Sequence, residues 1–157
     1  MPKSSAGLVL YRVRDSATQV LLVHPGGPFW AGKDAGAWTI PKGEVEAEEG
    51  QLDAARREFE EELGFSADGD FIPLGTITQK AGKVVRAWAL EGDCDPAGIK
   101  SNSFTIEWPP RSGKQQAFPE VDRAAFFGIE EAKRKINPAQ VELLSRLQAM
   151  VEEKVRL

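Results

Sequence analysis

Apolar residues occur along this chain in short runs whose spacing predicts strands in its first, middle and later parts. Val, Ile, Leu, Thr and aromatic residues dominate these runs, and Gly, Pro, Asp and Ser clusters bound them, which is typical of strands. The expected strands cover residues 7–13, 18–24, 71–78, 84–90, 103–108 and 123–128. Residues 14–16 and 80–83 predict tight turns. The Gly- and Pro-rich or polar stretches 25–36, 91–102 and 109–119 predict loops.

Helix-forming residues dominate three other segments. Residues 49–63 contain no proline and predict a helix that ends at Gly64. Residues 129–136 predict a short helix, and Asn137 with Pro138 predicts the start of a last helix that runs to about residue 155. Its expected apolar stripe consists of Val141, Leu144, Leu147, Val151 and Val155. The order of these elements predicts an α+β (mixed α/β) fold, because strands are followed by a helix, then by more strands and finally by helices.

Length and charge narrow the class of protein. The chain has 157 residues, which predicts one domain covering residues 1–157. It carries 20 basic and 24 acidic residues, and the net charge of −4 argues against a general nucleic-acid or membrane-surface binder. Cys94 is the single cysteine, so neither an intrachain disulfide nor a cysteine zinc site is expected. The N-terminal apolar run is too short for a signal peptide, so a cytoplasmic protein is expected, either a monomer or a homodimer.

Three carboxylates share one face of the helix predicted at residues 49–63. At 100° per residue, its core stripe consists of Leu52, Ala55, Phe59 and Leu63. Glu58, Glu61 and Glu62 lie together beside that stripe, where they repel one another and face an unfavourable helix dipole. A solvated acidic face is the ordinary interpretation of such a cluster. Because these carboxylates flank the packed side of the helix, a divalent cation bound to them is the alternative that we favour.

The residues around this helix form a longer motif. Gly43 is followed after five residues by Glu49, and after seven more by Arg57-Glu58-Phe59-Glu60-Glu61-Glu62-Leu63-Gly64-Phe65. This pattern, over residues 43–65, matches every constrained position of the Nudix box. The chain therefore resembles the Nudix hydrolases, and the resemblance implies an α/β/α sandwich with a mixed sheet between helices. It also implies a pyrophosphohydrolase, acting on an acid anhydride in a nucleoside diphosphate-linked substrate.

The resemblance assigns roles to individual residues. Glu58, Glu61, Glu62 and the Gly43 carbonyl would bind Mg²⁺ or Mn²⁺, Arg57 would orient the glutamates, and Glu49 would support them. Lys42, beside this motif, could neutralise a phosphate or be an ordinary surface lysine. Glu120, in a predicted loop, could bind metal or act as general base, since family members often carry a glutamate there; a turn residue is the alternative. His24 is expected to have a structural role.

Features outside the box bear on the substrate, which is expected to be a small nucleotide. The segment from Trp38 to Gly43 is similar to the corresponding segment of the Nudix branch that cleaves diadenosine tetraphosphate. Glu44, however, stands where that branch often has a histidine. Hydrolysis of ordinary or oxidised nucleoside triphosphates is the alternative, and a non-catalytic nucleotide-binding regulator is a third possibility. Aromatic and cationic side chains interleave near a Pro-Pro loop and suit a base and its phosphates. These candidate substrate-binding residues are Phe104, Trp108, Arg111 and Lys114.

Overall fold

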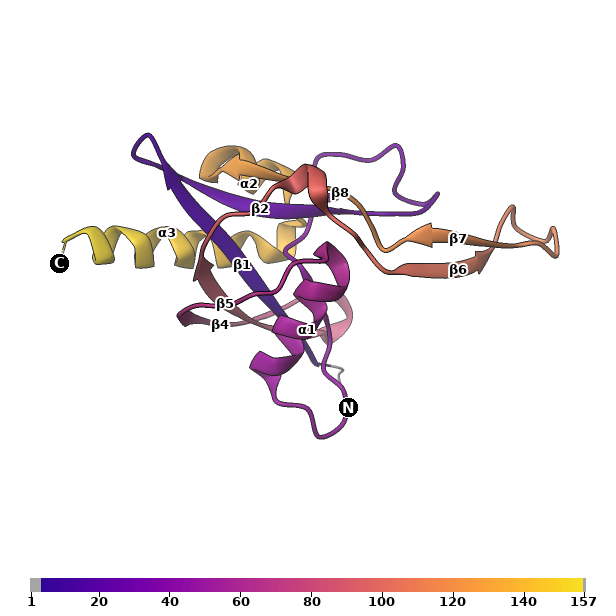
Figure 1. The fold of residues 1–157 in the computed structure, drawn as a ribbon, viewed down its shortest axis with the longest axis horizontal. Helices are drawn as coiled ribbons and strands as arrows, with labels where there is room; N and C mark the ends of the chain where they lie inside the picture. Colours follow the sequence, from indigo (N-terminus) through magenta and orange to yellow (C-terminus); the bar gives the residue numbers. More distant parts are fainter. Residues whose placement is uncertain (1–3, 157) are drawn as a thin grey trace.

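A six-stranded mixed sheet forms the centre of the computed structural model, which describes residues 4–156 and, within its last helix, the side chains up to residue 154 (Figure 1). The sheet strands are β1 (Ser4–Arg14), β2 (Ala17–Pro25), β3 (Lys42–Glu44), β4 (Phe71–Thr78), β5 (Val84–Glu91) and β8 (Val121–Gly128). Their order is β4-β5-β1-β2-β8, with β3 paired to β1. β1 and β5 are parallel, and the other sheet pairs are antiparallel. The mixed sheet expected from the sequence is thus confirmed.

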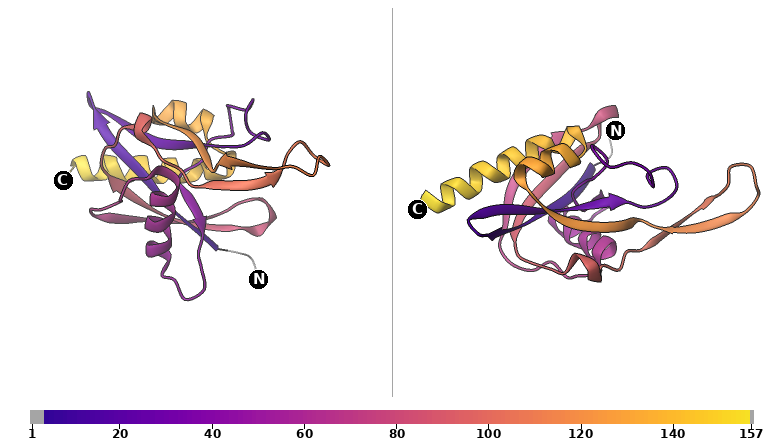
Figure 2. Two further views of the ribbon diagram at one scale, coloured as in Figure 1. Left: turned by 45° about the vertical axis from the view of Figure 1, so that its right-hand side comes forward. Right: turned by 90° about the horizontal axis from the view of Figure 1, so that it is seen from above.

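Helices cover both faces of this sheet (Figure 2). Helix α1 (Gln51–Leu63) packs on one face, where Leu8 and Leu10 of β1 meet Phe59 in one apolar cluster. Helices α2 (Ile129–Lys135) and α3 (Val141–Arg156) pack on the opposite face. There Val9 and Tyr11 of β1 meet residues of α3 in a second cluster. Successive residues of a strand point to opposite faces, so the buried apolar residues in the middle of β1 contribute to both layers.

The ends of the helices follow the local sequence. Gly64 ends α1 with φ 79°, a left-handed conformation that glycine adopts without strain. The side chain of Asn137 accepts a hydrogen bond from the Ala139 N–H at the start of the short 3₁₀ turn Pro138–Gln140, which leads into α3. Leu144, Leu147 and Val151 of the expected stripe are buried and Val141 is partly buried, whereas the Val155 side chain lies outside the described residues. None of the described helices is long and apolar enough to cross a membrane.

A two-stranded ribbon projects from the body of the molecule (Figure 1). It pairs β6 (Ser103–Glu107) with β7 (Gln115–Pro119). The expected strand at residues 103–108 is confirmed, but the prediction of a loop throughout 109–119 is wrong, because Gln115–Pro119 is a strand. Its Gln-Gln-Ala sequence and terminal proline lack the β-branched residues and alternation that indicate a strand, so pairing with β6 determines its conformation. Strand β3 is too short to have been predicted.

Candidate active site

Helix α1 lies against β3, and the contact brings one carboxylate onto a glycine. A Cβ atom on Gly43 would overlap the carboxyl group of Glu58, so only glycine leaves room for that side chain in this position. The Glu58 side chain is 14% exposed. Gly43 pairs with Ala6 of β1, which fixes it in the sheet. The carboxylate of Glu58 is thereby held against the backbone of residue 43.

Arg57 connects the acids of this region. Its Nε donates to Glu49 Oε2 at 2.8 Å, and its Nη1 donates to Glu58 Oε1 at 2.9 Å and to Glu61 Oε2 at 3.1 Å. Its Nη2 donates to the Glu44 carbonyl at 3.0 Å. These hydrogen bonds raise the pKa of Arg57 and lower that of Glu49, so both stay charged. Arg57 thus contacts Glu58 and Glu61 at once, as a residue expected to orient the glutamates would.

Glu62 is the most buried acid of the cluster, with 7% of its surface exposed. Burial and the charge of Glu58 raise its pKa to about 8, although the backbone N–H of Lys42 donates a hydrogen bond to it. Burial also raises the pKa of Glu58, against the opposing effect of Arg57. Two neighbouring carboxylates therefore resist ionisation in the absence of a cation.

Glu120, between β7 and β8, joins the cluster from a segment distant in the sequence. Its backbone N–H donates to the Asn102 carbonyl at 2.7 Å, and its carbonyl accepts from the Gly26 N–H at 3.0 Å. Burial and, after it, the charge of Glu61 raise the pKa of Glu120. Its own charge raises the pKa of Glu58 and of Glu62. The fold thus brings this loop residue close to the carboxylates of α1, as its proposed role requires.

A half-buried lysine, Lys42, flanks the acids. Burial lowers the pKa of Lys42, the nearby charge of Lys83 lowers it further, and Glu62 and Glu58 oppose this effect. Lys83 directly precedes β5 and was not among the residues singled out from the sequence. Its proximity to Lys42 depends on the pairing of β1 with both β3 and β5, which the sequence does not reveal. Lys42 borders the acidic cluster and Lys83 lies near Lys42, where an anionic substrate could lie.

The cluster has the chemistry of a divalent-metal site. Several carboxylates and a backbone carbonyl are the hard oxygen donors that Mg²⁺ and Mn²⁺ prefer. Over the described residues, no three acidic, histidine or cysteine side chains already converge on one point that could hold a metal. Glu58 and Glu61 instead share the Arg57 guanidinium. Glu58 and Glu61 lie close to Glu62 and Glu120, and these like charges repel one another. A bound cation would relieve this repulsion, so the set of oxygen donors fits Mg²⁺ or Mn²⁺.

Comparison with known proteins identifies the family. The model of the NUDIX domain matches residues 1–147. The chain belongs to the Nudix family. Nudix enzymes hydrolyse pyrophosphate bonds, and this chain, whose box carries every acid, is a pyrophosphohydrolase acting on a nucleotide substrate. No curated protein matches the chain at a significant level of sequence similarity.

Solved Nudix structures share the fold. An Ap4A hydrolase from C. elegans, solved as a binary complex, is 22% identical with TM-score 0.69, covering 95% of this chain and 98% of that one. A mutT/nudix family protein from Listeria innocua is 20% identical with TM-score 0.66, covering 100% and 99%. The NUDIX domain of Shewanella oneidensis NrtR, solved with ADP ribose, is 14% identical with TM-score 0.67, covering 96% and 89%. At these identities the likeness shows a common fold.

The candidate substrate-binding residues lie at two places relative to the Nudix box. Phe104 is near the base of the ribbon, where its ring faces Gly27, and Trp108 directly follows β6. Arg111 and Lys114 lie in the exposed turn at the ribbon's far end. The last residue pair of the ribbon, Glu107 with Gln115, lies four residues beyond the first pair, Ser103 with Pro119, which is a distance of roughly 14 Å. Phe104 pairs with Phe118, two residues before Glu120, whereas the two cations of the turn lie at the opposite end of the ribbon.

His24 has the structural role expected of it. It is fully buried, its Nδ1 lies 2.8 Å from Asp122 Oδ1, and its Nε2 lies 2.7 Å from the Lys33 carbonyl. Its ring also packs edge-to-face on Trp38 at 5.3 Å between centroids. His24 thereby ties the loop after β2 to the strand that follows Glu120.

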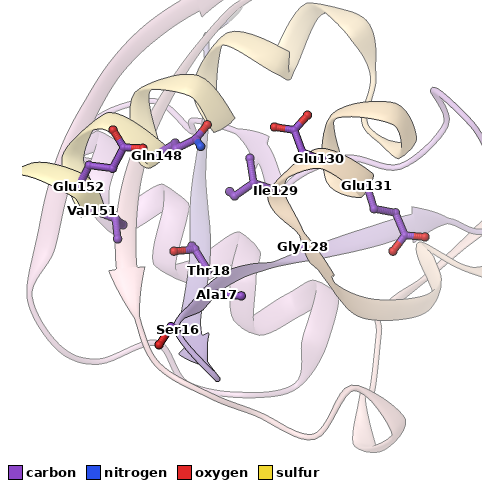
Figure 3. Close-up of a pocket in the computed structure, with 10 residues that line it drawn as sticks. All are labelled: Ser16, Ala17, Thr18, Gly128, Ile129, Glu130, Glu131, Gln148, Val151 and Glu152. Carbon is purple, nitrogen blue, oxygen red and sulfur yellow. The ribbon is translucent and has the colours of Figure 1, made fainter. Parts of the chain in front are cut away.

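An open groove of about 670 Å³ lies away from the Nudix box (Figure 3). It runs between the start of β2, the end of β8 and the faces of α2 and α3, and Ile129 and Val151 contribute apolar surface. Glu120 precedes β8, whereas the groove meets the other end of that strand at Gly128, roughly 25 Å along it. Its acidic side chains are Glu130, Glu131 and Glu152. An acidic groove so far from the box does not suit the phosphates of the substrate.

Proposed function

We propose that this Nudix protein is a Mg²⁺- or Mn²⁺-dependent hydrolase of dinucleoside polyphosphates such as diadenosine tetraphosphate. The observation that carries the proposal is the gathering of Glu58, Glu61, Glu62 and Glu120 beside Lys42. Hydrolysis of a phosphoanhydride requires neutralisation of phosphate charge and activation of a water molecule. The same small region supplies acidic oxygens for metal and a cation for phosphate.

In this proposal Glu58, Glu61, Glu62 and the Gly43 carbonyl hold the metal. When bound, the metal supplies charge neutralisation and lowers the pKa of water. Arg57 is a positioning residue, since its guanidinium fixes the carboxylates of Glu58 and Glu61. Lys42 neutralises a phosphate oxygen as a point charge.

Glu120 accepts a proton from the attacking water in this proposal. Burial and the charge of Glu61 raise its pKa, so the pKa of this carboxyl group lies closer to neutral pH than that of an exposed glutamate. Such a shift favours a general base, because proton transfer is most efficient when the catalytic pKa lies near the working pH. Glu120 also lies in a connection anchored by two backbone hydrogen bonds, so its backbone is held in place.

Two features support a dinucleoside substrate over other nucleotides. The Trp38 to Gly43 segment resembles the diadenosine tetraphosphate branch, and the C. elegans Ap4A hydrolase shares the fold over nearly the whole chain. Lys42 borders the acidic cluster and Lys83 lies near Lys42, and two cations in this region suit a polyphosphate chain longer than a diphosphate.

A nucleoside triphosphate is the second candidate substrate. Glu44 stands where the diadenosine tetraphosphate branch often has a histidine. That branch also often carries a tyrosine downstream of the box, whereas the only tyrosine here, Tyr11, lies upstream of the box and is buried. These two departures from the branch are the observations that support the triphosphate as a second candidate.

A panel of nucleotides with Mg²⁺ or Mn²⁺, analysed by product chromatography, tests the proposal. The expected result is release of ATP and AMP from diadenosine tetraphosphate. Turnover of ordinary or oxidised nucleoside triphosphates with a far higher kcat/KM would replace the proposed substrate with the second candidate. Absence of metal-dependent cleavage of every nucleotide in the panel would overturn both.

A further inference from the structure

Two adjacent aromatic side chains are exposed in the loop after β2. Phe29 is 64% exposed and Trp30 is 39% exposed. Among residues 4–154, Val13 is the other large apolar side chain with this degree of exposure, and it lies near the end of β1 remote from the box. Single exposed apolar residues are common, but neighbouring aromatic rings that remain exposed in a small protein indicate a binding surface.

The two rings continue onto the ribbon. Phe29 packs edge-to-face on Trp108 with centroids 5.7 Å apart. A Cβ atom on Gly27 would lie 2.8 Å from the Phe104 ring, so the loop backbone rests directly on that ring. Trp108 directly follows β6, and its N–H still donates to the Lys114 carbonyl across the ribbon at 2.9 Å. Because Trp108 is four residues from Phe104 in this extended segment, the two rings share one face of the ribbon. We call the surface formed by Phe29, Trp30, Phe104 and Trp108 the aromatic platform.

The loop that carries Phe29 and Trp30 is fixed at both ends. At its start, the Gly26 N–H donates to the Glu120 carbonyl at 3.0 Å. At its other end, the Lys33 carbonyl lies 2.7 Å from Nε2 of the buried His24. The Lys33 ammonium group lies over the Trp30 ring, 5.2 Å from its centroid. The exposed rings are thus held in place before any ligand binds, which lowers the entropic cost of binding.

The platform adjoins the acidic cluster through Glu120. Phe29 follows Gly26 by three residues, so its Cα lies within about 11 Å of the residue that is hydrogen-bonded to Glu120. A ligand that places phosphate at the acids would thus have its next group near these rings. Every nucleobase has a flat π face that stacks on aromatic side chains without requiring a particular sequence.

We propose that the aromatic platform binds a nucleobase of the substrate, with Phe29 and Trp30 as its main contacts. This inference rests on the proposed function, because it assumes that the phosphates lie at the acidic cluster. It adds the recognition of a base by residues of the loop after β2. Lys33, over Trp30, provides a cation beside the base for an adjoining phosphate.

Steady-state kinetics of Phe29→Ala and Trp30→Ala test the inference, with Val13→Ala as the matched control for loss of an exposed apolar side chain. Loss of base stacking should raise KM for the best nucleotide substrate about 10-fold or more and leave kcat within about 2-fold. Val13→Ala should behave as the wild type, and Phe29→Tyr should retain most of the affinity, because the ring remains. Inorganic tripolyphosphate, which has no base, should inhibit the wild type and the variants equally.

A second measurement separates this inference from the proposed function. In the absence of metal, added adenosine or guanosine should quench the tryptophan fluorescence of the wild type, and Trp30→Ala should lose most of that change. Quenching that persists when no nucleotide is hydrolysed would reject the proposed function and support the platform. Unchanged KM in both alanine variants would overturn the platform while leaving the hydrolase intact. Equal weakening of tripolyphosphate inhibition would also overturn it, because the loop would then act only by shaping the phosphate site.

Discussion

Replacing Glu62 by glutamine should stabilise the metal-free protein. The pKa of Glu62 is about 8 in the folded chain, against an ordinary value of 4.5, because the carboxyl group is buried beside Glu58. The unfolded chain therefore releases this proton at a lower pH than the folded chain does. As the pH rises from about 4.5 to about 8, the folded state loses stability relative to the unfolded state, and above pH 8 the loss is complete. A glutamine, which cannot ionise, removes this loss.

The magnitude follows from the shift. One pKa unit corresponds to about 1.4 kcal/mol, so the 2.5 units between pH 4.5 and pH 7 correspond to about 3 kcal/mol of lost stability. At pH 5 the loss is about 1 kcal/mol by the same relation. Glutamine retains an acceptor for the Lys42 N–H but loses the attraction to the Lys42 ammonium group. A net gain of about 2 kcal/mol at pH 7 is expected, which raises the Tm of a chain this size by about 4–8 °C.

Thermal unfolding followed by calorimetry at pH 5, 7 and 8, with a chelator or with excess Mg²⁺, measures this effect. The wild type should lose Tm as the pH rises and regain it with Mg²⁺, because a ligand that binds the folded state stabilises it. Glu62→Gln should show a shallower pH dependence and a smaller response to Mg²⁺. Glu60→Gln, an exposed neighbour on the same helix, is the control and should behave as the wild type. A Glu62→Gln Tm at or below that of the wild type at pH 8 with chelator would refute the reasoning.

Other substitutions test separate parts of the site. Gly43→Ala should displace the Glu58 carboxyl group and lower kcat/KM at least 10-fold, whereas Gly128→Ala, which meets open space, should leave kinetics unchanged. Arg57→Lys cannot hold several carboxylates at once and should raise the Mg²⁺ concentration needed for half-maximal activity, as a metal titration would show. Arg111→Ala should raise KM more than it lowers kcat if the ribbon turn contacts substrate, and an unchanged KM would remove Arg111 from the binding residues.

The helix of the box was predictable because its signals are local. Gly64, the apolar stripe and the Glu58–Glu61–Glu62 face all depend on residues within a few turns, and the structure confirms the element with a start at Gln51. The depth of burial of Glu62 could not be predicted, because it depends on the packing of β3 and Lys42 against α1. The wheel places that residue at the edge of the packed side, whereas its environment comes from strands distant in the sequence.

Long-range pairing explains what the sequence did not reveal. Strand β7 forms because it pairs with β6, although its own residues favour no strand. Lys83 lies near Lys42 because β1 pairs with both β3 and β5. The adjacent Phe29 and Trp30 in a loop otherwise rich in Gly and Pro were a visible signal, but their partner Trp108 is nearly eighty positions away. Such contacts follow from topology, which local pattern does not specify.

Turnover by Glu61→Gln tests the central claim most directly, namely that the acids of the box form a metal-dependent catalytic centre. The measurement is kcat with Mg²⁺ on the best nucleotide of the panel, with Glu60→Gln as the control on the same helix and circular dichroism to verify folding. The account predicts a loss of kcat by two or more orders of magnitude in Glu61→Gln and wild-type turnover in Glu60→Gln. Near-wild-type turnover in a folded Glu61→Gln protein would contradict it.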